Sequence, residues 1–315
     1  MRVPIKLLIL PKFDIGPLGN GICGEGELFY KEYVEGGTEY ELTGLFPGEK
    51  LYVKDGIALT LTHAGKVNTT ATLMAILSDP RLDCSKMHTL SVGCAGTNYE
   101  RTTMGDVVLA SAFADYDLGH QVIGSDGSLT WFPDSGLCQY GCVKLNAERI
   151  STVYEQIKNI PLETTEKTVT FMKQNVAADT RVYPIVLKGT FITSDNYWKG
   201  DDGHKIAKQI NKYYGCPDEY LVSDMEDIAV ARVLERFGLI EKLISIRVSV
   251  NLDCYMNGAT PEKLWSNNCF EDNMLEEDNE EGADIFETAM RNLFKVGKEI
   301  VMTMDDGQKT IDDRQ

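Results

Sequence analysis

Two short polar clusters in the second half of the chain could act on a bound ligand. Asp224-Met225-Glu226 holds two carboxylates around a thioether, and Asn251-Leu252-Asp253 holds an amide two residues before a carboxylate. A carboxylate accepts hydrogen bonds from hydroxyl groups and can carry a proton, whereas an amide donates and accepts hydrogen bonds but supplies no proton. The two clusters are therefore candidates for ligand binding and acid–base chemistry.

The residues around these clusters predict a strand, a helix and a second strand. Residues 220–222 favour a strand, residues 228–237 carry apolar side chains at helical spacing, and residues 242–252 are rich in Ile and Val. A unit of this length predicts a parallel pair of strands with the helix crossing over, and ligands bind at the carboxyl ends of such strands. As an alternative, Ser223 and Glu226 have the spacing of a capping box, in which Glu226 only satisfies the first helical turn.

Composition indicates a folded α/β protein without affinity for polyanions. The chain has 315 residues, 43% of them hydrophobic, and a net charge of −17, which argues against nucleic-acid and anionic-membrane surfaces. No apolar run approaches the roughly 18 residues that span a bilayer, and residues 7–10 are too short for a signal-peptide core. We expect a cytoplasmic homo-oligomer, with residues 1–315 forming a single domain whose ends (1–4 and 306–315) are frayed.

The cysteines do not form a recognisable metal or disulfide framework. All eight are scattered, no C-x-x-C motif occurs, and the nearest pair, Cys138 and Cys142, has no His-rich segment beside it. Free thiols in a reducing compartment fit this spacing better than a zinc site. We therefore expect no metal and no cofactor.

Glycine-containing segments precede the two clusters along the chain. They are Gly65-Lys66-Val67-Asn68, Gly93-Cys94-Ala95-Gly96-Thr97, Gly105-Asp106-Val107-Val108 and the run from Gly189 to Tyr197. The second is expected to be a turn after a strand over 87–92, because glycine lets backbone N–H groups approach a ligand oxygen closely. Followed by the two polar clusters, the segments resemble in order the nucleoside phosphorylase-I superfamily, and most closely its purine nucleoside permease family.

The resemblance implies a fold and an activity. The fold is a single three-layer α/β domain, with a mixed, mostly parallel central sheet flanked by helices. The activity is cleavage of the N-glycosidic bond of purine nucleosides, which passes through an oxocarbenium-like sugar. Glu226 and Met225, with Asp224, would bind the ribose. Asn251 would hydrogen-bond the base, and Asp253 would be the reserve acid.

The resemblance also assigns roles to residues outside the two clusters. The acidic residue after the first strand would activate water or lie near the ribose, a role that falls to Glu25 first and Glu27 second. Residues predicted to contact the base, beside Asn251, are Tyr197, Trp131 and Phe132, although packing in the core is an open alternative for these aromatic side chains. The nucleophile pocket would comprise Gly24, Gly65, Cys94, Thr97 and Asn98.

The attacking nucleophile stays open at this point. Hexameric phosphorylases carry an arginine before the glycine turn, and Ser91 stands at that position here. Inorganic phosphate as a co-substrate would then need other donors, such as Arg101 or backbone N–H groups. Phosphorolysis is favoured slightly over hydrolysis, because Asn251 resembles the branch that acts on 6-oxopurines. A non-catalytic protein that binds nucleosides and assists their uptake is the alternative of another class.

Overall fold

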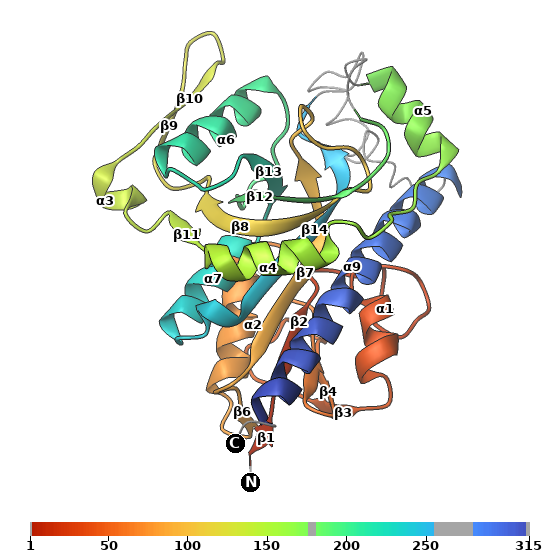
Figure 1. The fold of residues 1–315 in the computed structure, drawn as a ribbon. Coiled ribbons are helices and arrows are strands. Elements are labelled where there is room, and N and C mark those ends of the chain that lie inside the picture. Colours follow the sequence, from red (N-terminus) through yellow and green to blue (C-terminus); the bar gives the residue numbers. More distant parts are fainter. Residues whose placement is uncertain (1, 176–180, 255–279, 313–315) are drawn as a thin grey trace.

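The computed structural model describes residues 2–175, 181–254 and 280–312, in which helices flank a central mixed sheet of ten strands (Figure 1). The strands of this sheet are β2 Leu7–Leu10, β3 Thr38–Tyr40, β4 Leu51–Lys54, β5 Ile57–Leu59, β7 His88–Thr97, β8 Val107–Asp115, β11 Cys142–Lys144, β12 Val186–Thr193, β13 Tyr220–Asp224 and β14 Leu243–Leu252. The predicted architecture, a mixed central sheet between helices, is confirmed.

The remaining elements are short strands and the helices. Strand β1 Val3–Pro4 pairs with β6 Leu82–Asp83, and β9 His120–Ile123 pairs with β10 Leu129–Phe132. The helices are α1 Glu27–Phe29, α2 Lys66–Ser78, α3 Ser135–Cys138, α4 Ala147–Ile157, α5 Glu166–Asn175, α6 Asp201–Tyr213, α7 Asp227–Arg236 and α9 Glu280–Asp312, with a π-helical turn η1 Tyr30–Val34 and a 3-10 turn η2 Ile240–Lys242. In the described ranges, no helix is both long enough and apolar enough to cross a membrane.

Five strands of the sheet close into a ring. The order along the sheet is β11-β8-β12-β13-β7-β2-β5-β4-β3, and β14 pairs with both β7 and β8. The path β8-β12-β13-β7-β14 therefore returns to its start. Every residue of β8 and of β14 is buried, which explains why these strands read as continuous apolar and small-residue runs.

The strands that carry the two polar clusters do not pair with each other. Strand β7 lies between them, parallel to β14 and antiparallel to β13. The predicted parallel crossover pair is therefore wrong. The contact between β13 and β7 is limited to Val222 opposite Thr97 and Ser223 opposite Gly96, so the carboxyl ends of β7, β13 and β14 still meet.

The segment Gly93–Thr97 is strand rather than turn. It forms the second half of β7, and β14 pairs with β7 from Leu243 opposite Thr89 to Leu252 opposite Thr97. The predicted glycine turn is wrong because this long-range pairing decides the local backbone conformation. The glycines instead remove side chains from a strand that other groups approach closely.

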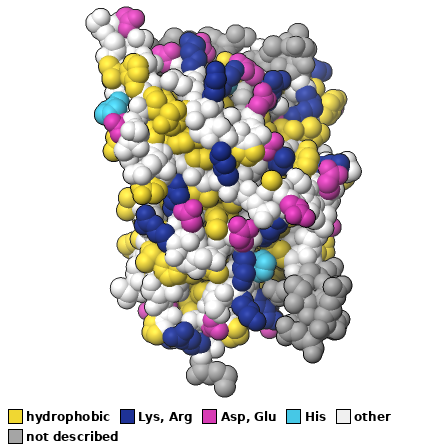
Figure 2. Space-filling view, turned by 60° about the vertical axis from the view of Figure 1, so that its left-hand side comes forward, with side chains coloured by type: hydrophobic (Ala, Val, Ile, Leu, Met, Phe, Trp, Pro, Cys, Tyr) yellow, Lys and Arg dark blue, Asp and Glu magenta, His cyan; other side chains and the backbone are white. Residues whose placement is uncertain are grey.

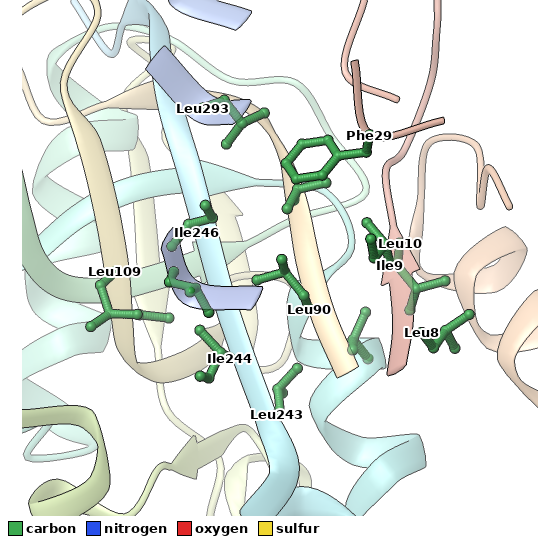
Figure 3. Close-up of a cluster of buried hydrophobic side chains, with 14 of the residues drawn as sticks. Leu8, Ile9, Leu10, Phe29, Leu90, Leu109, Leu243, Ile244, Ile246 and Leu293 are labelled. Carbon is green, nitrogen blue, oxygen red and sulfur yellow. The ribbon is translucent and has the colours of Figure 1, made fainter. Parts of the chain in front are cut away.

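Helices cover both faces of β14. Ile246 points to α9, because a Cβ on Gly297 of that helix would lie 3.6 Å from its Cδ1, whereas Arg247 reaches Asp227 at the start of α7. Figure 3 shows Phe29 and Leu293 over the strands that carry Leu90 and Ile246. Each of these fully buried side chains stabilises the fold by about 1.5–3 kcal/mol.

The region 119–140 is not an irregular loop, as the sequence predicts, but the β9–β10 hairpin followed by α3. Trp131 is 0% exposed, packs against Ile206 and Ile210 of α6, and donates a hydrogen bond from Nε1 to the Leu118 carbonyl at 3.0 Å. Contact of Trp131 with a ligand does not fit this position, and its role is to fill a second core. Phe132, on the opposite face of the hairpin, is half exposed.

The surface carries interspersed charges. On the face in Figure 2, Lys and Arg side chains lie in separate groups among acidic and apolar side chains.

Candidate active site

Arg247 lies in the middle of β14, opposite Gly93 of β7, and stands at the centre of a buried group of charges. Its side chain is 2% exposed. Its Nε donates to Asp227 Oδ2 at 3.0 Å, and one terminal nitrogen donates to Glu226 Oε2 at 2.8 Å and to Asp224 Oδ2 at 3.2 Å. The other terminal nitrogen donates to the Cys94 carbonyl at 3.1 Å. A charge buried this deeply is stable because three carboxylates surround it.

Lys12 and Glu25, from the segment between β2 and α1, complete this group. The Lys12 ammonium lies 2.6 Å from Ser91 Oγ and 3.4 Å from Asp227 Oδ1. The Glu25 carboxylate accepts the backbone N–H groups of Lys12 and Cys94, each at 2.7 Å. We call Lys12, Glu25, Asp224, Glu226, Asp227 and Arg247 the Arg247 cluster. Its four carboxylates face two cations.

Burial and charge divide the carboxylates of this cluster. Burial, aided by the negative charge of Asp227, raises the pKa of Asp224 to about 7. Burial also raises the pKa of Glu226, although Arg247 opposes this. For Asp227, burial alone would raise the pKa, but Arg247 and Lys12 hold it below its ordinary value. Asp227 is therefore the permanent counter-ion of the two cations, while Glu226 and Asp224 bind protons more readily.

Asp224, rather than a Ser223–Glu226 capping box, caps helix α7. Its Oδ2 accepts the N–H groups of Glu226 at 3.0 Å and Asp227 at 2.6 Å, and its Oδ1 accepts the Thr193 hydroxyl at 2.7 Å. The capping-box interpretation is wrong, because Glu226 makes no side-chain cap. The chain thus occupies both oxygens of Asp224, as it does those of Glu25 and Glu226, and the predicted contact of Asp224 with ribose stays a prediction.

Two glycines let backbone and side chains approach Glu226 and Glu25. Gly65 begins α2 with φ at 96°, which favours glycine, and its N–H donates to Glu226 Oε1 at 3.2 Å. A Cβ on Gly93 would lie 2.6 Å from a terminal nitrogen of Arg247 and 3.1 Å from both oxygens of Glu25. The cluster therefore needs glycine at position 93.

A second arrangement, which holds no cation, surrounds Gly96. A Cβ there would lie 2.4 Å from Ser223 Oγ, 2.5 Å from Asp253 Oδ1 and 2.7 Å from Asn251 Nδ2. A bulge between Ser249 and Asn251 sets Asn251 opposite Gly96. We call Ser223, Asn251 and Asp253 the Gly96 cluster. Asn251 and Asp253 reach the same side of Gly96, as their spacing predicts.

The members of the Gly96 cluster differ in how fully they are hydrogen-bonded. Asp253 is 0% exposed and accepts the Ser223 hydroxyl at 2.7 Å and the Tyr220 phenol. Burial raises the pKa of Asp253 to about 6, although these two hydrogen bonds oppose the rise. Asn251 is 5% exposed, and its side-chain amide has no hydrogen-bond partner among the described residues. A buried amide without a partner is costly unless a ligand or water supplies one.

Comparison with known proteins identifies the family. The sequence model described as purine nucleoside permease (NUP) matches residues 4–310. The chain belongs to this family. A protein of Schizosaccharomyces pombe named "Probable purine nucleoside permease C285.05" is 26% identical over 227 residues, which are 65% of this chain and 65% of that protein. The NUP chain thus spans less than two thirds of the length of this curated relative.

Solved structures share the fold of this NUP protein. A 5'-methylthioadenosine/S-adenosylhomocysteine nucleosidase from Neisseria meningitidis, in complex with methylthio-immucillin-A, has a TM-score of 0.56 at 17% identity over 95% of this chain and 99% of its own. The enzyme from Colwellia psychrerythraea 34H, in complex with adenine, has a TM-score of 0.56 at 14% identity over 96% and 98%. At such identities the likeness establishes the fold alone.

The structure of the NUP protein separates the two acidic candidates after the first strand. Glu25 joins the Arg247 cluster. Glu27 instead accepts the N–H groups of Gly19 at 2.6 Å and Gly21 at 2.9 Å, and so anchors the glycine-rich loop. A Cβ on Gly24 would lie 1.8 Å from Asp14 Oδ1, so Gly24 belongs to the packing of the same loop. Glu25 is therefore the acidic residue that a ligand at Arg247 would meet.

Several predicted donors of a nucleophile pocket are used by the fold itself. Thr97 is fully buried, and its hydroxyl lies 2.7 Å from Ser249 Oγ inside the strand ring. The Asn98 amide donates to the Tyr220 carbonyl at 2.9 Å. Arg101 is exposed and pairs with Glu219 at 3.0 Å. These positions do not fit the predicted contacts with phosphate, because each polar group already has a partner in the chain.

The remaining predicted residues keep their roles as predictions. The Cys94 N–H donates to Glu25, and burial, with Glu25 beside it, raises the pKa of the Cys94 thiol well above its ordinary value. Met225 is half-buried between Asp224 and Glu226. Tyr197 lies in the loop after β12 and is 43% exposed. Neutral thiol, thioether and ring surfaces suit contact with an uncharged ligand.

Sequence reasoning missed the cations of the site and their counter-ion Asp227. A signal was present, because Arg247 interrupts the run Ile244–Leu252, which otherwise lacks charge, and a buried charge needs a partner. Lys12 likewise follows a fully apolar strand. Lys66, next to Gly65, was also missed as a charge partner and pairs with Asp115 at 3.0 Å and Asp117 at 2.7 Å.

Proposed function

We propose that this NUP protein cleaves the N-glycosidic bond of purine nucleosides, with the sugar at the Arg247 cluster and the base at the Gly96 cluster. One observation carries the proposal: the Glu226 carboxylate, fixed by Arg247 and the Gly65 N–H, stands beside Glu25, and the amide of Asn251, which has no hydrogen-bond partner among the described residues, lies on the same strand as Arg247. The fold shared with nucleosidases supports it.

The Arg247 cluster suits a sugar that becomes positively charged. Glu226 accepts hydrogen bonds from the ribose hydroxyls, and Met225 packs under the ring. The Glu226 carboxylate is already oriented by Arg247 and Gly65, so it needs no reorganisation when the oxocarbenium charge develops. Negative charge held in place near that cation lowers the barrier more than it strengthens ground-state binding.

The nucleophile best supported is water, activated by Glu25. In the described part of the chain, the cations nearest the Arg247 cluster are Lys12, Lys66 and Arg247, and carboxylates neutralise each of them, while the charge of Lys199 acts on Asp253 of the Gly96 cluster. A phosphate dianion would have to compete with those buried carboxylates for its donors. Ser91, which replaces the arginine of hexameric phosphorylases, hydrogen-bonds Asp227 at 2.6 Å. Hydrolysis is therefore our proposal, in place of the phosphorolysis that the sequence slightly favours.

Asn251 is proposed to read the base. Its NH₂ group can donate to N7 and O6 of a 6-oxopurine, which are both acceptors. Adenosine presents an amino group at the 6-position, so one donor of the amide would be mismatched, at a cost of about 1–3 kcal/mol. Inosine and guanosine should therefore be cleaved better than adenosine. Tyr197 is the proposed aromatic contact of the base.

Chromatography of inosine, guanosine and adenosine incubated with the protein, with and without phosphate, tests this function. Release of free base and ribose without phosphate is the expected result. Ribose 1-phosphate formed only when phosphate is present would replace hydrolysis by phosphorolysis. Saturable nucleoside binding without any base release would favour a binding protein that assists uptake, the class to which the family's name points.

A further inference from the structure

We propose that Ser223, Asp253 and Tyr220 form a proton relay that supplies the leaving base, an inference that rests on the proposed function. A purine is a poor leaving group unless one of its ring nitrogens gains a proton as the bond breaks. Asn251 faces the proposed base position but has no proton to give. Within the Gly96 cluster, the acidic group is Asp253, so the proton has to start there.

The geometry routes that proton through Ser223. Asp253 is 0% exposed, whereas Ser223 is half-buried and its Oγ lies 2.7 Å from Asp253 Oδ1, so a ligand entering from solvent meets Ser223 first. Ser223 Oγ and Asn251 Nδ2 lie 2.4 and 2.7 Å from the same point, the Cβ position of Gly96. A base edge that meets the Asn251 amide is therefore within reach of the Ser223 hydroxyl as well.

The relay extends away from the site toward solvent. The Tyr220 phenol donates to the second oxygen of Asp253 and lies 3.4 Å from His204 Nδ1. His204 Nε2 lies 3.3 Å from Glu100 Oε1, and the Glu100 side chain is exposed. Hydrogen-bond distances therefore join Asp253, Tyr220 and His204, and Glu100 at the surface lies near His204 without a hydrogen bond to its Nε2.

Few charges approach the carboxyl of Asp253. The hydroxyls of Tyr220 and Ser223 come from β13, the phenol of Tyr116 faces it from the end of β8, and the ammonium of Lys199 acts on it from the loop after β12. Burial dominates and raises the pKa of Asp253 to about 6. A carboxyl with this pKa is protonated often enough near neutral pH to serve as an acid.

Proton transfers accompany cleavage of the glycosidic bond. When the C1′–N9 bond breaks, its electron pair moves onto the purine, N7 takes the proton of Ser223 Oγ, and Ser223 takes the carboxyl proton of Asp253. The oxygen of water bonds C1′, and its proton passes to Glu25. As the phenol proton of Tyr220 moves to Asp253, the Nδ1 proton of His204 moves to Tyr220 and a proton from water at the surface restores His204, while Glu25 returns its proton to water.

Two substrates that differ in their need for a proton test the relay. Inosine has a leaving group that must be protonated, whereas 4-nitrophenyl β-D-ribofuranoside releases a stable phenolate. Asp253→Asn and Ser223→Ala should each lower kcat on inosine by about 100-fold, but change turnover of the nitrophenyl riboside by no more than about threefold. Ser111→Ala, at a buried serine of β8 outside both clusters, is the matched control and should leave both rates unchanged.

A shift of the pH profile gives a readout that packing alone would not move. Tyr220→Phe removes a hydrogen bond that favours the ionised carboxylate, so the pKa of Asp253 should rise and the alkaline limb of kcat/KM for inosine should move to higher pH. An unmoved limb would overturn the relay, as would equal losses on both substrates. Inosine turnover unaffected by either variant would reject the relay and leave the proposed function intact. A wild-type protein that cleaves neither substrate would reject both.

Discussion

The Arg247 cluster and the Gly96 cluster share strands β7, β13 and β14, but they are held in opposite ways. In the first, two cations and several N–H groups fix four carboxylates, so the charges are tied in place. In the second, hydroxyl, amide and carboxyl groups meet around one glycine, and the Asn251 amide has no partner in the described chain. Fixed charge suits the part of a substrate that is always the same. An unpaired amide suits the part that varies.

The largest effect is expected when the carboxylate predicted to bind ribose is neutralised. Glu226→Gln should lower kcat by about 1,000-fold or more for every nucleoside, because it removes charge that stabilises the transition state. Arg247 keeps Asp224 and Asp227 as partners, so stability should fall by only about 1–3 kcal/mol. Steady-state kinetics and urea unfolding measure the two effects.

The matched control for this change lies on the same helix. Glu235→Gln alters an exposed residue of α7 that pairs with Arg232, and it should leave turnover unchanged. If Glu226→Gln and Glu235→Gln are equally active, Glu226 has no part in the chemistry and the division between the two clusters fails.

A change in the second cluster should alter selectivity instead of overall turnover. Asn251→Asp should move the ratio of kcat/KM for adenosine over inosine upward by about 10- to 100-fold, because a carboxylate accepts from the 6-amino group. Competition between the two nucleosides measures this ratio directly. An unchanged ratio would show that Asn251 does not read the base, and Asp253 would become the residue to test.

The strands and helices around the site were predictable because their patterns are local. Residues 220–222, 228–237 and 242–252 correspond to β13, α7 and β14, and the periodic apolar side chains specify these elements. The partners of β13 and β14 were not predictable, since β7 comes from a segment more than a hundred residues earlier and inserts between them. The closed strand ring follows from the same long-range pairing.

The candidate site was predictable only in part, for a similar reason. Glu25, Glu226 and Asn251 could be singled out because each follows or ends a predicted strand. The partners that fix them could not, because Lys12, Gly65 and Arg247 approach from three separate parts of the chain. Thr97 and Asp224 look equally suitable in the sequence, and only the folded chain reveals that its own groups occupy their oxygens.

A smaller effect concerns stability and pH at Asp253. Its pKa in the folded protein is about 6, above the ordinary 3.8, so folding favours the protonated carboxyl. The stability that this provides is complete below the ordinary pKa and is lost as pH rises through about 6. The free energy of unfolding of the wild type should therefore fall between pH 4 and 7. Asp253→Asn should make this fall smaller by at most about 3 kcal/mol.

Urea unfolding at a series of pH values measures this effect. Asp55→Asn, in the exposed turn between β4 and β5, is the control and should keep the wild-type pH dependence. The same pH dependence of the free energy of unfolding in the Asp253 variant and in wild type would show that folding does not raise the pKa of Asp253.

The smallest effect on turnover is expected at Thr97, which the sequence places in the nucleophile pocket. Thr97→Val should cost about 1–2 kcal/mol of stability, because it leaves the buried hydroxyls of Ser249 and Thr102 with one partner fewer. Its kcat should stay within about threefold of wild type, since Thr97 lies inside the strand ring. Loss of turnover without loss of stability would return Thr97 to the nucleophile pocket.

Proton NMR of inosine in phosphate-free buffer tests the central claim most directly. We expect the wild-type protein to convert inosine to hypoxanthine and free ribose. Glu226→Gln, folded and at the same concentration, should leave the nucleoside intact. Inosine that stays intact in the presence of the wild-type protein, although it binds saturably, would contradict the claim that these two clusters cleave the N-glycosidic bond.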